Sequence, residues 1–498
     1  MTGDLPDITA KRAALSPAAI AFEEPATGRR TTYAELDARA ARAAALLQSR
    51  GIREGDRVAI LCRNRVEFFE ILFGCAKLGT VLVPLNWRMP PAELDLLVAD
   101  AEPSLLLYGA EDAAAAARLA GGTPALGLDE DYQALLAAAP AGRFRATWPA
   151  GGTWYLLYTS GTTGRPKGVV YTFRMALSNY VSLSAAIGLR SGDATASFLP
   201  LFHTAGINLH ALPTLIAGGR VLMLPAFDAD AVVALLEARR LDAFFAVPTV
   251  YQALLDHPGF TAAPLGHVRH WGCGGAPLPD SVVHRCRDLG MRLCNGMGMT
   301  ETGPTAFLLD PADAWERIGS VGKPQLLCSA RIVDAAGREV PEREVGDLQF
   351  AGPGITPGYW RNEEATRAAF TPDGWLRSGD LACRDEAGFF YIAGRRKEMF
   401  ISGGENVYPA EVENVLCAHP AVIDVAVLGR PDPRWGEVGK AFVQLAPQAQ
   451  RPREDRLADE LRAFCRQRLA PYKVPVSFDF VADFPRTSAG KIQKHLLA

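Results

Sequence analysis

The segment YTSGTTGRPKGV, residues 158–169, follows an apolar stretch that predicts a strand at Tyr155–Tyr158. Backbone N–H groups and Ser/Thr hydroxyls in such a loop can bind phosphate oxygens, and Lys167 would add a compact cation. Lysine is rare in this chain, at nine of 52 basic residues, which makes Lys167 more informative than a generic surface charge. Two residues separate Gly164 from Lys167, so the segment is not a Walker A loop. A plain surface turn is the alternative.

The composition describes a compact globular protein with room for two or three domains. Of 498 residues, 49% are hydrophobic and 21% charged, which excludes a mainly disordered chain. A net charge of −3 without a basic run argues against a nucleic-acid binder. The first ten residues lack the pattern of an export signal, and charged residues or prolines interrupt the apolar stretches 68–85 and 243–255, so no membrane span is expected. Nine cysteines without a C-x-x-C pair fit a cytoplasmic location.

Hydrophobic periodicity predicts alternating strands and helices in the first part of the chain. Thr32 and Glu35 form a capping box before a helix that ends at Gly51. The segments that follow are expected as strand 57–61, helix 66–77, strand 81–85, helix 91–99 and strand 104–108. Such alternation is typical of parallel sheets with crossover helices. Short strands with turns at 332–355 indicate a small β-rich subdomain, and a charged segment places a domain boundary near Gly394.

These segments, together with several others in the same order, resemble the adenylate-forming superfamily of acyl-CoA synthetases, peptide-synthetase adenylation domains and luciferases. The resemblance runs from Thr32 to Lys491. It implies an α/β fold whose large N-terminal domain, residues 1–394, has two parallel-sheet α/β subdomains and a small β-rich subdomain. A small mobile α+β C-terminal domain, residues 395–498, would follow. In this family the loop quoted above binds the ATP phosphates, which here implies contacts from Thr159, Ser160, Gly161, Thr162, Thr163, Gly164 and Lys167.

Two further segments resemble nucleotide motifs of the family. GGAP, residues 274–277, would line the adenine and part of the acyl pocket, and its alternative is a tight turn. NGMGMTET, residues 295–302, would place the Thr300 hydroxyl on phosphate and the Glu301 carboxylate on Mg²⁺, which prefers oxygen ligands. Met297 and Phe173 depart from the family, which usually has an aromatic residue and His at these positions. The implied nucleotide contacts are Gly274, Gly275, Ala276, Pro277, Asn295, Gly296, Met297 and Gly298.

The resemblance also assigns roles to single side chains. Asp380 would accept hydrogen bonds from the ribose hydroxyls, and Arg395 would be a basic partner of the nucleotide. Outside this context an Asp is usually solvated or caps a helix. His203 would orient the substrate carboxylate. Lys491 would be the catalytic lysine, whose ammonium stabilises the negative charge that builds up as the adenylate forms.

The resemblance implies that the C-terminal lobe rotates between two half-reactions. Lys397 falls at the hinge position, where backbone torsion would absorb the rotation. Gly403 and Gly404 would lie beside the pantetheine tunnel during thioester formation. The spacing from Pro485 to Lys491 also matches a recognition pattern of protein acetyltransferases, and acetylation would remove the charge of Lys491.

The chain is therefore expected to be an acyl-CoA synthetase that uses ATP, Mg²⁺ and coenzyme A. A free carboxylate resists nucleophilic attack, and joining it to AMP supplies a leaving group that a thiolate can displace. A freestanding ligase that loads an acyl-carrier protein is the alternative within the family. A luciferase-like oxygenase and a nucleotide-binding module without turnover stay open.

The acyl substrate is expected to lie in a largely apolar pocket with Tyr251 and Trp271 as flat walls. No basic residue stands out there for a second carboxylate, and no Asp is placed to hold an α-amino group. Residues 227–258 and 403–413 resemble hydroxycinnamate and medium-chain fatty acid CoA ligases, and the choice between aryl and alkyl acids stays open. Besides the small-molecule acid, ATP and CoA, candidate partners are an acetyltransferase acting on Lys491 and a second copy of the chain in a homodimer. The expected pocket residues are His203, Gly206, Val247, Tyr251, Trp271, Gly274 and Met299.

Overall fold

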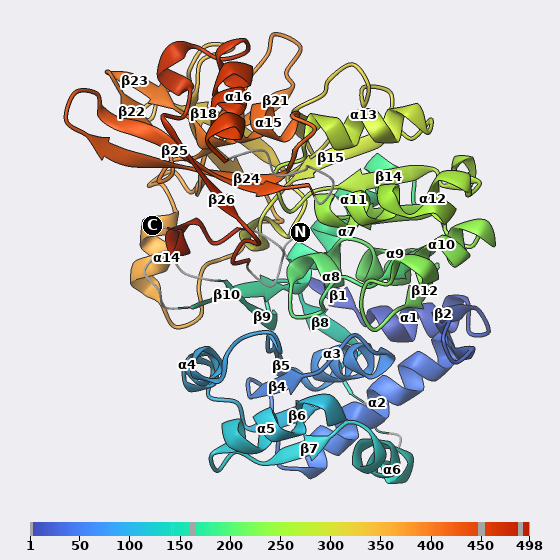
Figure 1. The fold of residues 1–498 in the computed structure, drawn as a ribbon. Coiled ribbons are helices and arrows are strands. Elements are labelled where there is room, and N and C mark those ends of the chain that lie inside the picture. Colours follow the sequence, from blue (N-terminus) through green and yellow to red (C-terminus); the bar gives the residue numbers. More distant parts are fainter. Residues whose placement is uncertain are drawn as a thin grey trace.

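The computed structural model describes residues 3–140, 142, 144–159, 166–446, 454–486 and 492–497. The first of its three main layers is a six-stranded sheet at the bottom of Figure 1. Five of the six strands are parallel, and the edge strand β10 runs antiparallel to β9. The strand order is β10 (Lys167–Thr172), β9 (Thr153–Thr159), β5 (Val81–Pro84), β4 (Arg57–Leu61), β6 (Leu105–Tyr108) and β7 (Ala125–Gly127).

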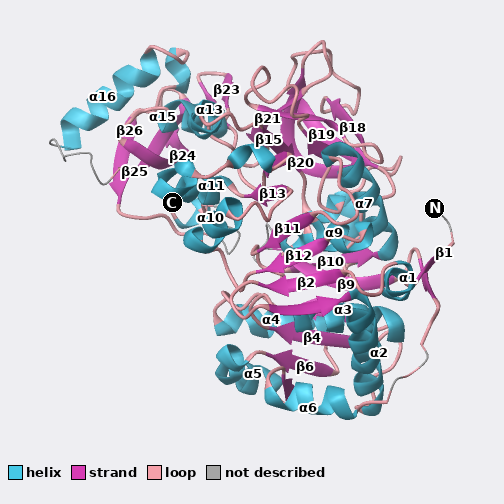
Figure 2. Ribbon diagram, turned by 90° about the vertical axis from the view of Figure 1, so that its right-hand side faces the viewer, coloured by secondary structure: helices cyan, strands magenta, loops and turns pink. Residues whose placement is uncertain are grey.

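Helices cover both faces of this sheet, as the alternating sequence pattern predicts. One face packs against α2 (Tyr33–Ser49), α3 (Val66–Leu78) and α6 (Glu130–Ala138), and the other against α4 (Pro91–Ala101) and α5 (Ala113–Ala120). The capping box that starts α2 is confirmed, because the Thr32 hydroxyl accepts from Glu35 N at 3.2 Å while the Glu35 carboxylate accepts from Thr32 N at 2.7 Å. Figure 2 shows the layers from the side.

A thirteen-stranded sheet forms the second layer. Its middle part is parallel and is extended at one edge by an antiparallel strand. The order there is β15 (Leu293–Met297), β14 (His270–Cys273), β13 (Ala243–Ala246), β11 (Ala194–Ser197), β12 (Arg220–Met223), β2 (Ile20–Glu24) and β3 (Arg29–Thr32). The helices around this part are α1 (Ile8–Leu15), α7 (Phe173–Ile187), α8 (Thr204–Asn208), α9 (Ala211–Ala217), α10 (Ala229–Glu237), α11 (Pro248–Asp256), α12 (Pro258–Ala262) and α13 (Asp280–Asp288).

The β-rich segment expected as a small separate subdomain continues this same sheet. Beyond β15 the strands become antiparallel, and hydrogen bonds join each strand to the next without a break. They are β16 (Phe307–Leu308), β17 (Ser320–Pro324), β21 (Phe390–Arg395), β20 (Leu376–Arg384), β19 (Gly346–Ala351) and β18 (Ser329–Val333). Outside the two large sheets, β1 (Asp4–Pro6) pairs with β8 (Thr147–Pro149), and α14 (Glu363–Ala369) precedes β20.

The C-terminal lobe has its own sheet and core. The chain leaves the large sheet at the end of β21 and enters the lobe sheet at β22 (Phe400–Ser402), so the domain boundary expected near Gly394 lies between these two strands or next to them. Asn414 Nδ2 in α15 (Pro409–Cys417) donates to the Asp280 carboxylate in α13 at 3.2 Å, a contact between the lobe and the large domain. The lobe elements are β22 (Phe400–Ser402), β23 (Glu405–Val407), α15 (Pro409–Cys417), β24 (Val422–Asp432), β25 (Gly436–Leu445), α16 (Glu454–Arg466) and β26 (Ser477–Val481).

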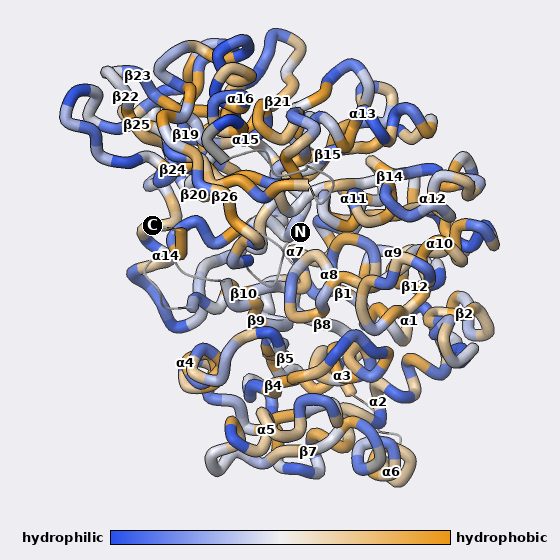
Figure 3. Tube along the Cα trace, viewed as in Figure 1, coloured by the Kyte–Doolittle hydropathy of each residue, from blue (hydrophilic) through white to orange (hydrophobic). Residues whose placement is uncertain are grey.

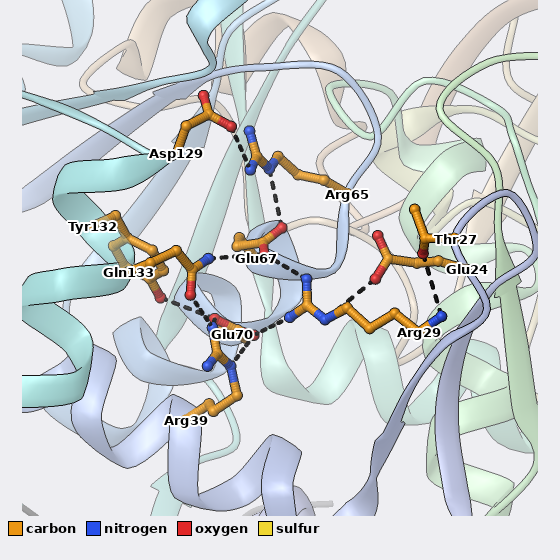
Figure 4. A network of polar contacts seen from close by, with 10 residues as sticks. All are labelled: Glu24, Thr27, Arg29, Arg39, Arg65, Glu67, Glu70, Asp129, Tyr132 and Gln133. Atoms are coloured by element: carbon orange, nitrogen blue, oxygen red, sulfur yellow. Dashed lines mark hydrogen bonds and ion pairs between the residues drawn. The ribbon is translucent and has the colours of Figure 1, made fainter.

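A buried ion network joins the two large sheets (Figure 4). Glu67 and Glu70 of α3 are almost fully buried. Glu67 accepts from Arg29 of β3 and from Arg65, each at 3.0 Å, while Arg39 of α2 pairs with Glu70. Buried carboxylates need such partners, because an unpaired buried charge is strongly destabilising. The network therefore fixes the first sheet against the second.

Hydropathy follows the layers. In Figure 3 hydrophobic stretches concentrate in the strands and in the helix faces packed on them, and hydrophilic stretches lie on outer elements such as α13. Among the described residues, no helix is long and apolar enough to cross a membrane.

Candidate active site

A cavity of about 1090 Å³ lies where the large domain meets the C-terminal lobe. Residues directly after the carboxyl ends of the parallel strands line it: Phe198 after β11, Val247 after β13, Gly274 after β14 and Gly298 after β15. This edge of a parallel sheet is the usual place for a ligand in α/β folds. The volume is at the upper end of small-molecule pockets, which leaves room for a nucleotide beside a second small molecule.

The described residues on either side of the proposed phosphate loop lie at this cavity. Thr159 ends β9, Lys167 starts β10, and the two residues are paired across the antiparallel ladder. Both line the cavity, and Lys167 Nζ lies 5.2 Å from the centroid of the Tyr359 ring. The intervening predicted contacts, Ser160, Gly161, Thr162, Thr163 and Gly164, lie outside the described residues.

Backbone packing explains two of the predicted glycines. A Cβ atom on Gly274 would lie 2.7 Å from Gly296 O, and one on Gly298 would lie 1.5 Å from Pro304 O, so neither position has room for a side chain. Gly274, Gly275, Gly296 and Gly298 all line the cavity and bring backbone close to a ligand. Ala276 and Pro277 belong to the same turn but are not among the described residues that line the cavity.

Thr300 and Glu301 lie side by side at the cavity wall. They belong to a single 3₁₀ turn, Thr300–Thr302, and both are buried apart from their cavity side. Glu301 Oε1 accepts a hydrogen bond from the Tyr359 hydroxyl at 2.9 Å. Burial, with the nearby Glu301 carboxylate, raises the pKa of Tyr359, so its hydroxyl stays protonated and keeps donating.

Tyr359 was missed by sequence reasoning, although it contacts both Glu301 and Lys167. An isolated bridge between Tyr359 and Val169 of β10 holds it there. No local motif signals this role, because Tyr359 is far from both partners in the sequence.

Met297 lines the cavity at the position where an aromatic residue was expected from the family. Phe173, the second departure, packs in the core and stacks on Trp154 with 4.8 Å between ring centroids. Asn295 is not among the described lining residues, and its side-chain amide donates to Ser320 O at 3.1 Å. Its visible role is therefore to join β15 to β17.

The buried carboxylate of Asp380 pairs with the partly exposed guanidinium of Arg395 at the cavity wall. They lie opposite each other in the β20–β21 ladder, and Asp380 Oδ1 is 2.8 Å from Arg395 Nε. Arg395 lines the cavity, as do Ser378 and Gly379, whereas Asp380 is not among the described lining residues. The carboxylate thus holds the guanidinium at the wall.

The predicted acyl pocket needs a correction. His203, Val247 and Met299 line the cavity. Tyr251 and Trp271 lie in the packed core behind it, where the Tyr251 hydroxyl donates to Gly272 O at 2.9 Å and Trp271 packs on Phe244. Their size and apolar neighbours mark core residues, and neither is a wall of the cavity in the described part of the chain.

Gly206 also lies behind the wall. It is buried in α8, and a Cβ atom there would lie 2.2 Å from Pro200 O. Within the described residues it lines a much smaller adjacent pocket that shares His210 and Phe245 with the main cavity.

The C-terminal lobe contributes described residues to the cavity wall. Lys397, Arg486 and Gln493 line the cavity. Lys491 lies outside the described residues, but Arg486 and Ile492 on either side of it form a bridge, and Gln493 N donates to Pro485 O at 2.7 Å. The described ends of the Lys491 segment therefore face the cavity.

The lobe segment expected to act in thioester formation, at Gly403 and Gly404, lies away from the cavity. Gly403 and Gly404 form the turn between β22 and β23, both with positive φ, and Gly403 N donates to Trp435 O at 2.8 Å. Figure 1 shows this hairpin at the outer edge of the lobe. Neither glycine is among the described residues that line the cavity.

The charge of the cavity favours an anion. The described lining residues include two acidic side chains, Glu93 and Glu301, and seven basic ones. The basic residues are Arg88, Lys167, Arg377, Arg395, Arg396, Lys397 and Arg486. A triphosphate suits such a surface, and a carboxylate oxygen such as that of Glu301 suits a hard cation bound to it.

Two family models match the chain. The AMP-binding enzyme family matches residues 9–360, and the AMP-binding enzyme C-terminal domain matches residues 411–491. Similar proteins cover nearly the same length. A feruloyl-CoA synthase from Amycolatopsis sp is 43% identical over 97% of this chain and 96% of its own. An indoleacetate–CoA ligase from Aromatoleum aromaticum is 36% identical, over 97% and 95%, and the long-chain-fatty-acid–CoA ligase FadD13 from Mycobacterium tuberculosis is 35% identical, over 98% and 96%.

Solved structures of MatB from Rhodopseudomonas palustris, 33% identical, match 99% of this chain and 98% of theirs. The ATP-bound form gives a TM-score of 0.90 and the apo form 0.81. The overall arrangement of this chain is thus more similar to the ATP-bound form.

Proposed function

Since this chain belongs to the AMP-binding enzyme family and is an AMP-forming acyl-CoA ligase, we propose that it activates an aromatic carboxylic acid. The observation that carries the proposal is the mixed lining of one cavity, with basic and hydroxyl groups suited to ATP and apolar and aromatic groups suited to an arene. Phe198, Phe245 and Leu308 belong to the apolar part. The 43% identity to a feruloyl-CoA synthase supports the same acid class.

In the first half-reaction, a carboxylate oxygen attacks the α-phosphorus of ATP, and pyrophosphate leaves to give acyl-AMP. Lys167 and the residues of its loop bind phosphate oxygens, and Lys491 offsets the charge that builds up between the two anions. His203 orients the carboxylate. Arg395, held by Asp380, binds the nucleotide at the wall.

Mg²⁺ fits the residues present. Glu301 offers a carboxylate at the cavity wall. The hydrogen bond from the Tyr359 hydroxyl to one oxygen of this carboxylate fixes its orientation. When bound, the cation would neutralise part of the phosphate charge. Glu301 and Thr300 are the residues that would hold the metal-bound phosphates.

In the second half-reaction, the CoA thiolate attacks the acyl carbonyl carbon and AMP leaves. Gly403 and Gly404 lie away from the cavity, so this step needs a rotation of the lobe, for which Lys397 is the proposed hinge. The structure then corresponds to the adenylation arrangement. The higher TM-score to ATP-bound MatB supports this assignment.

The test is a panel of acids incubated with ATP, Mg²⁺ and CoA, with the acyl-CoA product identified by mass spectrometry. We expect arylpropenoic or arylacetic acids to give the highest kcat/KM, and replacing CoA by an acyl-carrier protein to abolish thioester formation. Transfer to the carrier at a rate equal to that with CoA would support the carrier-loading alternative.

A fatty acid is the second candidate, favoured by the 35% identity to FadD13 and by the apolar cavity lining. Medium-chain fatty acids in the same panel discriminate the two. If they exceed every aromatic acid in kcat/KM, the aromatic assignment is wrong.

A further inference from the structure

Two histidines that the nucleotide chemistry does not use lie in the wall of the same cavity. His210 directly precedes α9, and His270 is the first residue of β14. Both line the cavity and are more than nine-tenths buried, at 6% and 3% exposure. His210 also packs edge-on against Phe245, with 6.1 Å between ring centroids.

Their position is deep. Gly274 follows the carboxyl end of β14 and His270 is at its amino end, four residues earlier. At roughly 3.3 Å per residue, the cavity wall extends about 13 Å along this strand. A substrate that places its carboxylate near the nucleotide at one end of β14 therefore points its other end toward the two imidazoles.

The imidazole nitrogens are not satisfied by the protein. Nδ1 of His210 and both ring nitrogens of His270 are buried and have no hydrogen-bond partner among the described residues. Buried polar atoms in folded proteins nearly always have a partner, because leaving one unpaired costs free energy. Unpaired polar atoms that line a cavity indicate that a ligand or water occupies it.

Both rings are neutral near neutral pH. Burial, with a smaller contribution from His270, lowers the pKa of His210 to about 3, and burial lowers that of His270 to about 4. A neutral imidazole has one nitrogen that donates and one that accepts. Such a pair suits an uncharged group that can also do both, such as a hydroxyl, and offers no positive charge to a second carboxylate.

We propose that His210 and His270 recognise a hydroxyl group on the end of the acid substrate remote from its carboxylate, and so select hydroxylated aromatic acids. The proposal rests on the function proposed above and specifies the substrate class. An acid with an apolar end would leave the same nitrogens unpaired, and sites built to hydrogen-bond a substrate hydroxyl reject analogues without one.

The first test uses three acids of nearly the same shape on the wild-type enzyme: 4-hydroxycinnamate, 4-methylcinnamate and cinnamate. Pyrophosphate release with ATP and saturating CoA gives kcat/KM for each. We expect the hydroxylated acid to exceed the other two by at least about tenfold. Equal values for all three would overturn the proposal while leaving the aromatic ligase intact, whereas no turnover of any aromatic acid would refute the function itself.

The second test assigns the preference to the two side chains. His210→Leu and His270→Leu should each reduce the ratio of kcat/KM for 4-hydroxycinnamate over cinnamate to about one, mainly by slowing the hydroxylated acid. His210→Gln keeps a donor and an acceptor and should retain most of the preference. His284, exposed on α13, is the matched control, and H284L should leave the ratio unchanged.

A ratio that stays at the wild-type value in both leucine variants would overturn the assignment. If a leucine variant does not fold, the comparison of 4-hydroxycinnamate with 4-methylcinnamate on the wild-type enzyme still decides the proposal, because a methyl group matches the size of the hydroxyl without its hydrogen bonds.

Discussion

Lys494, three residues after Lys491, pairs with two carboxylates of the C-terminal lobe, and replacing it by methionine should loosen the lobe. Its Nζ lies 2.7 Å from Glu413 Oε1 in α15 and 2.8 Å from Glu398 Oε2, next to the hinge. The side chains of Lys494 and Glu413 are 17% and 15% exposed. Removing one partner of a buried pair costs about 3 kcal/mol, because the remaining charge is left unpaired. That corresponds to a factor of about 150 in a local opening equilibrium.

Hydrogen exchange of the α15 amides measures this opening. In Lys494→Met we expect exchange to accelerate about a hundredfold relative to wild type, and the first half-reaction to slow because Lys491 is only three residues away. The same helix offers a matched control. Lys473 pairs with Glu411 at 2.8 Å, but Glu411 is 42% exposed, so K473M should cost at most about 1 kcal/mol. Equal acceleration in both variants, or none in Lys494→Met, would refute the reasoning.

The pH dependence checks the cause. Burial raises the pKa of Glu413 above its ordinary value of 4.5, and Lys494 opposes the rise. Without Lys494 the folded-state pKa is higher still, so the folded state holds a proton that the unfolded chain releases above pH 4.5. The defect of Lys494→Met should therefore be smallest near pH 4.5 and grow as pH rises. A second substitution, Glu413→Gln, should remove this dependence.

Three further predictions concern the two half-reactions and the metal. Lys491→Ala should reduce adenylation at least a hundredfold, while thioester formation from supplied acyl-AMP is nearly unchanged; equal loss in both assays would argue against lobe rotation. Lys397→Pro should restrict the hinge, so that pyrophosphate release persists while acyl-CoA formation falls at least tenfold; an unchanged rate of acyl-CoA formation would remove the hinge role. Glu301→Gln should raise the Mg²⁺ concentration needed for half-maximal activity by about tenfold or more, and an unchanged Mg²⁺ titration would exclude Glu301 as a ligand.

Local patterns were sufficient for much of the fold. The capping box at Thr32 and the alternating strands and helices are confirmed, because both depend on residues close together in the sequence. The strand expected at Tyr155–Tyr158 lies within β9, whereas the pairing of Thr159 with Lys167 in β10 was not predicted. The continuity of the β-rich strands with the parallel sheet was not predictable from periodicity, since it depends on which strand edges meet.

In the candidate site, too, the features that depend on long-range packing were not predictable from local sequence patterns. Tyr251 and Trp271 are close in the sequence to residues that line the cavity. The alternation of side chains along β14 and the packing of α11 nevertheless place both side chains in the core. Tyr359 reaches the site through its bridge to Val169, a long-range pairing that no local motif predicts. His210 and His270 look like ordinary core histidines in the sequence, and only their unpaired nitrogens in a cavity wall indicate a ligand.

The most direct test of the account is exchange of labelled pyrophosphate into ATP in the absence of CoA, because this reaction isolates formation of acyl-AMP. With purified enzyme, Mg²⁺ and 4-hydroxycinnamate, we predict exchange that depends on the acid and is lost in Lys491→Ala. Exchange that proceeds equally without any acid, or none with any acid in a broad panel, would contradict the claim that this cavity joins a carboxylate to AMP.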